Sequence, residues 1–143
     1  GLALNIYFDA SVIVALIAND PFADRLQKAM RSRSITPVVS DFAAAEFASA
    51  MARVVRMKQL AEKEARDIFS LFDAWVERSA VRIQSSAEDI RMATNVLRRL
   101  DLNLRAPDAI NIAIARRLDI ELATFDSRMG DCAKSLGVTP SKI

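Results

Sequence analysis

The chain has 143 residues, of which 52% are hydrophobic and 27% are charged, and its formal net charge is +2. This composition excludes intrinsic disorder, and we expect one folded domain over residues 2–143. The absence of histidine and the presence of a single cysteine, Cys132, exclude Ser-His-Asp catalysis, histidine-ligated zinc and a disulfide framework, so carboxylates must carry any acid–base or metal chemistry.

Short apolar runs alternate with amphipathic segments of helical length in the first part of the chain. The run over 35–39 is rich in β-branched residues, as is typical of a buried strand. Ser40 has the hydroxyl group that a helix N-cap requires. The predicted elements are, in chain order, a strand over 4–8, a helix over 12–18, a turn at 19–21, a helix over 22–31, a strand over 35–39 and a helix from Ser40 to about Met57.

The middle of the chain predicts two further helices around a short strand at 81–83. The helix over 60–78 carries one apolar stripe, which places Trp75 in the core. Ser86 and Asp89 have the spacing of a capping box. The helix that they open should bury one apolar stripe, made of Ile90, Ala93, Leu97 and Leu100.

The last part of the chain predicts a helix, a strand and a helix. Pro107 suits the first turn of a helix over 107–118, residues 120–124 form a strand, and Asp126 or Ser127 can cap the last helix. Strands separated by helices of this length require parallel crossovers. The sequence therefore predicts the α/β class, with helices on both faces of a central sheet in three layers.

Four acidic residues fall near the carboxyl ends of the predicted strands, where parallel sheets bind ligands. Asp9 follows the first strand and Asp126 the last, while Asp108 lies in the first turn of a helix. Glu46 lies two turns into the helix after the second strand. Each has a structural alternative, because the aspartates can cap or complement helices and Glu46 can belong to a solvated polar stripe.

Together the four acids indicate a divalent cation, since clustered carboxylates without one repel each other. Mg²⁺ prefers oxygen ligands, and Mn²⁺ fits the same set. Such an ion lowers the pKa of bound water and polarises a phosphodiester, so hydrolysis needs no protein nucleophile. With these four set aside, 14 of the 18 acidic side chains remain against 20 basic ones, a balance that favours a polyanionic partner.

The segments around these acids resemble the motifs of the PIN-domain nucleases. Residues 6–13 are similar to the first strand of that family with its Asp-x-Ser/Thr signature, and residues 37–47 are similar to its second strand and glutamate helix. Residues 104–110 resemble its third acidic motif, and residues 122–126 resemble its closing strand with Thr-x-Asp. The four motifs occur in the family's order over nearly the whole chain.

The resemblance implies a role for each site residue. The acidic quartet, which binds the metal and carries catalysis, would be Asp9, Glu46, Asp108 and Asp126. Ser11 and Asn111 are supporting residues, although Asn111 stands where many members have histidine, which leaves the substrate contact there open. The arginines that could contact phosphates, or be solvated surface residues, are Arg53, Arg56, Arg105, Arg116 and Arg117.

Within this family the short chain looks most like the VapC toxins. The resemblance implies a three-layer α/β/α PIN-like fold with four or five parallel strands, cleavage of RNA with Mg²⁺ or Mn²⁺, a homodimer, and inhibition by a protein antitoxin of a type II system. The choice of RNA over DNA rests on the resemblance alone. Because no apolar run spans a membrane and no signal peptide is recognised, we expect a cytoplasmic protein without membrane association.

Three alternatives remain at this point. A phosphoryl-receiver domain should have paired acids at the first strand and a lysine after the last, where this chain has only Asp9 and Arg128. A phosphatase with an Asp-x-Asp nucleophile is opposed by Ser11. A non-catalytic module on the same fold, which binds Mg²⁺, RNA or protein, should lack one of the four acids, and none is missing.

Overall fold

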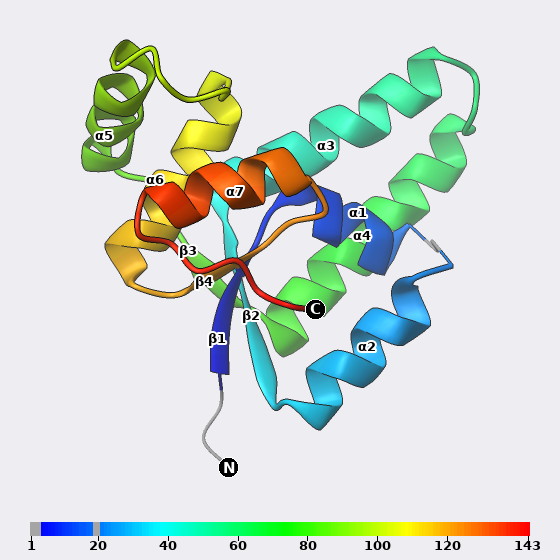
Figure 1. Ribbon diagram of the computed structural model, residues 1–143. Coiled ribbons are helices and arrows are strands. Elements are labelled where there is room, and N and C mark those ends of the chain that lie inside the picture. Colours follow the sequence, from blue (N-terminus) through cyan, green and yellow to red (C-terminus); the bar gives the residue numbers. More distant parts are fainter. Residues whose placement is uncertain (1–3, 19–20) are drawn as a thin grey trace.

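The computed structural model describes residues 4–18 and 21–143. Its four strands form one parallel sheet in the order β3-β2-β1-β4, as Figure 1 shows. The strands are β1 (Leu4–Phe8), β2 (Ile35–Ser40), β3 (Val81–Ile83) and β4 (Glu121–Ala123). The central strand β1 pairs Tyr7 with Val38 on one side and with Leu122 on the other. The predicted parallel sheet is confirmed, with four strands.

Helices cover both faces of the sheet. Successive side chains of a strand point to opposite faces, so the apolar side chains of one strand pack against helices on both sides. Ile6 and Phe8 of β1 belong to one apolar cluster, and Tyr7 belongs to the other. The first cluster includes residues of α1 (Ala10–Ile17), α2 (Ala23–Ser32), α3 (Asp41–Arg56) and α4 (Glu62–Ser79). The second includes residues of α5 (Ala87–Arg98), α6 (Ala106–Leu118) and α7 (Ser127–Ser135). The fold therefore has the three predicted layers (Figure 1).

Aromatic rings fill the first layer between the sheet and α4. The ring of Phe8 stacks on that of Trp75 with centroids 6.3 Å apart, and the rings of Phe47 and Phe72 stack at 4.7 Å. All four side chains are buried, which confirms the prediction for Trp75. This packing fixes α3 and α4 against the end of β1.

The predicted inward face of α5 is wrong at two positions. Ile90 is 47% exposed and Leu100, which follows the helix, is 89% exposed. Asp89 turns inward instead and is 1% exposed, because Arg117 Nε and Nη2 donate to its two carboxylate oxygens at 2.8 and 3.0 Å. This ion pair rotates the helix so that Ala93, Val96 and Asp89 face the core. The predicted capping box with Ser86 is present.

Two further predictions concern the chain outside the sheet. Residues 19 and 20 of the predicted turn lie outside the described residues. In the part of the chain that the structure describes, no helix is both long enough and apolar enough to cross a lipid bilayer.

Candidate metal centre

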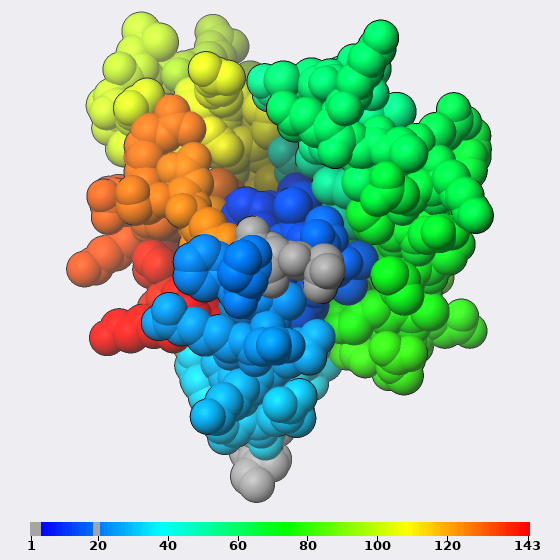
Figure 2. All heavy atoms as spheres, turned by 90° about the vertical axis from the view of Figure 1, so that its right-hand side faces the viewer, coloured from blue at the N-terminus to red at the C-terminus, as the bar shows by residue number. Residues whose placement is uncertain are grey.

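The carboxyl edge of the sheet carries the predicted acids. Asp9 directly follows β1, and Asp126 lies beyond β4 as the N-cap of α7. Glu46 lies in α3 and Asp108 in the first turn of α6. Figure 2 shows this side of the molecule hollowed between α3 and α4, in green, and the yellow end of α5 with α6, with the blue residues after β1 on the floor.

Asp9 is held rigidly at the start of α1. Its Oδ1 accepts hydrogen bonds from Ser11 Oγ at 2.6 Å and from the backbone N–H of Val12 at 3.1 Å. Ser11 Oγ in turn accepts from the backbone N–H of Phe125 at 3.1 Å, which ties the start of α1 to the loop after β4. Burial raises the pKa of Asp9, although hydrogen bonds from Ser11 and Thr124 act to lower it. The carboxylate is thus fixed in place without a compensating positive charge.

Glu46 is oriented by a buried polar network that begins in the sheet. Asn111 Nδ2 donates to Glu46 Oε1 at 2.7 Å and to the carbonyl oxygen of Pro107 at 3.0 Å. The Tyr7 hydroxyl donates to Asn111 Oδ1 and lies 2.7 Å from Ser40 Oγ. Since Tyr7 gives its only hydroxyl proton to Asn111, Ser40 must be the donor in the second contact. Both amide hydrogens of Asn111 are thus in use, one toward Glu46 and one toward Pro107. The amide cannot turn without losing a hydrogen bond, and it therefore holds the Glu46 carboxylate in one position.

The pKa of Glu46 shows that three of the acids share one environment. Burial raises this pKa, the hydrogen bond from Asn111 lowers it, and the negative charges of Asp9 and Asp108 raise it again. Burial is the largest cause of the net rise, and the contributions of Asp9 and Asp108 indicate that both carboxylates lie near Glu46. Among the described residues, neither Asp9 nor Glu46 forms an ion pair.

The other two acids are bridged by an arginine that the sequence did not single out. Arg128 Nη2 lies 3.4 Å from Asp108 Oδ2 and 3.3 Å from Asp126 Oδ2. Asp126 also accepts from the backbone N–H of Met129 at 3.2 Å, which confirms it as the cap of α7. Burial acts to raise the pKa of Asp126, but Met129 and Arg128 outweigh it and lower the pKa. One guanidinium therefore holds the carboxylates of two helices together.

No three histidine, cysteine, aspartate or glutamate side chains among the described residues stand close enough together to form a ready-made metal cage. Instead, Asp9 and Glu46 stand without a cation, and Asp108 and Asp126 share the Arg128 guanidinium. The donor set nevertheless fits a hard divalent ion, because it consists of carboxylate oxygens, and the carboxylates of Asp9 and Glu46 form no ion pair among the described residues. Hydroxyl and amide groups lie behind them.

The predicted phosphate contacts are scattered. Arg105 adjoins the site, since its backbone N–H donates to Asp108 Oδ2 at 3.3 Å. Arg53 and Arg56 are exposed in the last turn of α3. Arg116 lies at the opposite end of α6 from Asp108, in a hollow against α5. Arg117 of α6 donates to both carboxylate oxygens of the buried Asp89 in α5.

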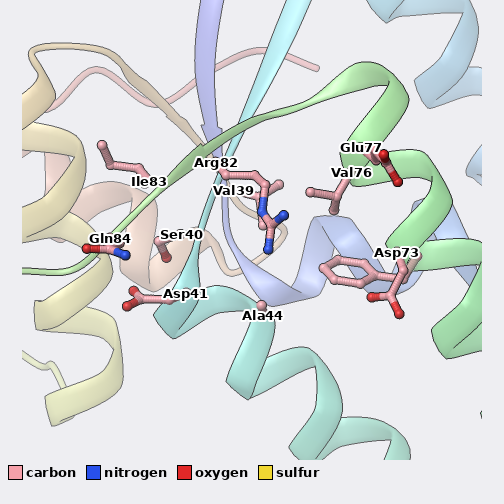
Figure 3. Close-up of a pocket in the computed structure, with 11 residues that line it drawn as sticks. Val39, Ser40, Asp41, Ala44, Asp73, Val76, Glu77, Arg82, Ile83 and Gln84 are labelled. Atoms are coloured by element: carbon pink, nitrogen blue, oxygen red, sulfur yellow. The ribbon is translucent and has the colours of Figure 1, made fainter.

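A separate cavity of about 730 Å³ opens between β3, α3 and α4. Figure 3 shows the Arg82 side chain extending into it between Asp41 and Asp73. None of the four predicted metal ligands lines this cavity. It shares only Ser40 with the polar network behind Glu46, so it is distinct from the candidate metal centre.

Comparison with known proteins gives concordant results. The family described as PIN domain matches residues 6–135. The chain is 33% identical over 136 residues to Ribonuclease VapC46 of Mycobacterium tuberculosis, with 93% of each chain covered. Its fold is similar to that of Mycobacterium tuberculosis VapC20, a Sarcin-Ricin loop cleaving toxin, at 18% identity and a TM-score of 0.70, over 96% of this chain and 99% of the other. VapBC2 from Rickettsia felis, bound to a DNA fragment from its promoter, matches at 14% identity and a TM-score of 0.70, over 96% of this chain and 98% of the other.

Proposed function

The chain belongs to the PIN-domain family, with VapC ribonucleases among its relatives, and we propose that it is a Mg²⁺- or Mn²⁺-dependent endoribonuclease. We further propose that it is the toxin of a type II toxin–antitoxin pair. The observation that carries the proposal is the placement of Asp9, Glu46 and Asp108 at the carboxyl edge of the sheet. The charges of Asp9 and Asp108 contribute to raising the pKa of Glu46 there. A folded protein tolerates such a group of charges most readily where a cation binds.

Four carboxylates would hold the metal, namely those of Asp9, Glu46, Asp108 and Asp126. When bound, a divalent ion supplies Lewis-acid chemistry, by which it lowers the pKa of water and polarises a phosphodiester. The protein supplies positioning: Ser11 Oγ fixes the Asp9 carboxylate, and Asn111 Nδ2 fixes that of Glu46.

Arg128 has a second role in this proposal. Its guanidinium already bridges two carboxylates at the edge of the site, and arginine also binds phosphate oxygens well. A phosphate group of the substrate would compete with Asp108 and Asp126 for this guanidinium. The backbone of Arg105 lies beside Asp108, so the Arg105 side chain is a second candidate for phosphate contact.

The partners of this chain are proposed from its relatives. One structural relative is a VapBC complex, which supports a protein antitoxin as the inhibitor, and the excess of basic side chains outside the site supports RNA as the substrate. A homodimer belongs to the same proposal, because the resemblance to the VapC toxins implies one. A cytoplasmic location also belongs to it, since RNA substrates are found there.

The decisive experiment incubates the purified protein with tRNA, mRNA and single-stranded DNA in Mg²⁺, Mn²⁺ or EDTA, and maps the cleavage products. We expect RNA cleavage with either metal and none in EDTA. Asp108→Asn should abolish cleavage, whereas Asp67→Asn, a matched change on the exposed surface of α4, should not. Cleavage that persists in EDTA or in Asp108→Asn would refute the proposal, and RNA binding without any cleavage would favour the non-catalytic module.

A further inference from the structure

A second cavity lies directly beside the candidate metal centre. Its volume is about 580 Å³, and it opens between α1, α2 and the loop before α7. Ser11, which donates to Asp9, and Phe125, which precedes Asp126, both line it. In Figure 2 the blue atoms of α2 adjoin the orange and red atoms of the last part of the chain on this side of the molecule. Ser11 and Phe125 thus connect the cavity to the carboxylate site.

Two aromatic rings stand in this cavity instead of in the core. The ring centroids of Phe22 and Phe125 lie 6.4 Å apart at an interplanar angle of 41°. Phe22 is 54% exposed and Phe125 is 48% exposed, although phenylalanine gains most from full burial. Neither belongs to the two apolar clusters that flank the sheet. The exposed part of the Phe125 ring is suited to stacking on a flat ligand.

The basic side chains of the cavity favour a flat ligand that carries negative charge. Arg25 and Lys142 line it, and none of the described lining residues is acidic. An aromatic surface with basic side chains around it is the combination by which proteins hold single-stranded nucleic acid, since bases stack on the rings and phosphates meet the cations. The cavity volume also falls in the range of about 300–1,000 Å³ that small-molecule sites have.

We propose that this cavity is a nucleotide subsite that takes one unpaired base of the substrate strand. The base stacks on Phe125 and meets Phe22 at its edge, because the two rings are inclined at 41°. Its phosphates face Arg25 and Lys142, and the neighbouring phosphodiester extends toward the carboxylates past Ser11. This subsite rests on the proposed function and deepens it. The subsite requires the stacked base to be unpaired, because a paired base cannot leave its stack without cost. It also makes the identity of the stacked base secondary, because phenylalanine offers no hydrogen bond to read it.

Binding measured without cleavage tests the subsite. Fluorescence anisotropy in EDTA would compare a labelled single-stranded oligouridine with a series of the same strand that carries one abasic residue at each position in turn. The wild-type protein should bind the abasic strand about tenfold more weakly at one position, which corresponds to the loss of one stacked base. Phe125→Leu and Phe22→Leu should bind the intact strand about tenfold more weakly and should no longer distinguish the abasic strand. Phe125→Trp should retain the distinction.

Matched controls separate stacking from general effects. Leu100→Ala removes an apolar side chain that is 89% exposed elsewhere and should leave binding unchanged. Arg25→Gln should weaken binding of both strands and reduce the salt dependence, while Arg66→Gln on α4 should do neither. The melting temperature of each variant shows whether it is folded.

Three results would decide between the proposals. The subsite would be overturned if the leucine variants bound RNA like the wild type, and a protein segment would then be the better candidate for the cavity. It would also be overturned if these variants lost affinity for the intact and the abasic strand equally. RNA cleavage with Mg²⁺ but without base-dependent binding would overturn the subsite and leave the nuclease standing. Base-dependent binding in a wild-type protein that cleaves no RNA would do the reverse.

Discussion

Replacing Glu46 with glutamine separates the charge of this residue from its shape. The glutamine Oε1 can still accept the hydrogen bond that Asn111 Nδ2 gives to Glu46 at 2.7 Å. Because burial and the charges of Asp9 and Asp108 raise the pKa of Glu46, its contribution to stability falls as pH rises through that pKa, and the ionised side chain destabilises the apoprotein at pH 7. Relief of this repulsion offsets the weaker neutral hydrogen bond, so we expect Glu46→Gln apoprotein to be equally or slightly more stable, by no more than about 1 kcal/mol.

With Mg²⁺ bound, the wild-type protein should instead be more stable than Glu46→Gln. At a Mg²⁺ concentration about 100 times the dissociation constant, binding stabilises the native state by about 2.7 kcal/mol, and a tenfold loss of affinity reduces that gain to about 1.4 kcal/mol. For a domain of this size the difference corresponds to about 4 °C in melting temperature. RNA cleavage at limiting Mg²⁺ should fall at least tenfold, or by about 1.4 kcal/mol of transition-state stabilisation.

Thermal unfolding with and without Mg²⁺, together with cleavage rates, measures both effects. Glu77→Gln is the matched control, since it removes a carboxylate from an exposed position of α4. It should change neither the metal-dependent gain nor the cleavage rate. If Glu46→Gln cleaves RNA at the wild-type rate and keeps the full gain in melting temperature, Glu46 does not bind the metal, and three aspartates remain to support the nuclease.

Three further predictions follow from the same contacts. Millimolar Mg²⁺ or Mn²⁺ should raise the melting temperature of the wild-type protein, and an unchanged curve would count against a site in the folded state. Arg128→Gln should bind Mg²⁺ more tightly in calorimetric titrations, because the guanidinium competes for Asp108 and Asp126; equal or weaker binding would contradict this competition. Burial acts to raise the pKa of Asp89 but Arg117 outweighs it and lowers the pKa, so this stabilisation is present above about pH 4 and is lost as the pH falls through the folded-state value. Asp89→Asn should therefore lower the free energy of unfolding by about 2 kcal/mol at pH 7, and urea denaturation at pH 3 should show a smaller difference.

The elements of the sheet could be predicted because their signals are local. The apolar run that ends at Asp9 and the short run over 81–83 give β1 and β3 with the observed bounds. Ser40 and Asp126 cap helices through hydrogen bonds that span three residues, so the sequence around each contains the whole signal. Parallel pairing then follows from the crossover helices between the strands.

The features that the sequence did not reveal depend on contacts between distant residues. The orientation of α5 is set by Asp89 with Arg117, 28 positions away, and an apolar periodicity within one helix does not contain that information. Likewise, Arg128 meets Asp108 only after α6 and α7 have packed. Its one local signal is a basic side chain in the first turn of the helix that Asp126 caps.

The strand order has a consequence for how the protein is synthesised. β1 is made before β4, the strand with which it pairs on one side. The segment that ties down Asp9 through Ser11, and the helix that carries Arg128, follow β4 in the chain. These groups can meet only after the chain through α7 has emerged from the ribosome. A growing chain therefore holds no assembled carboxylate centre until α7 has been made.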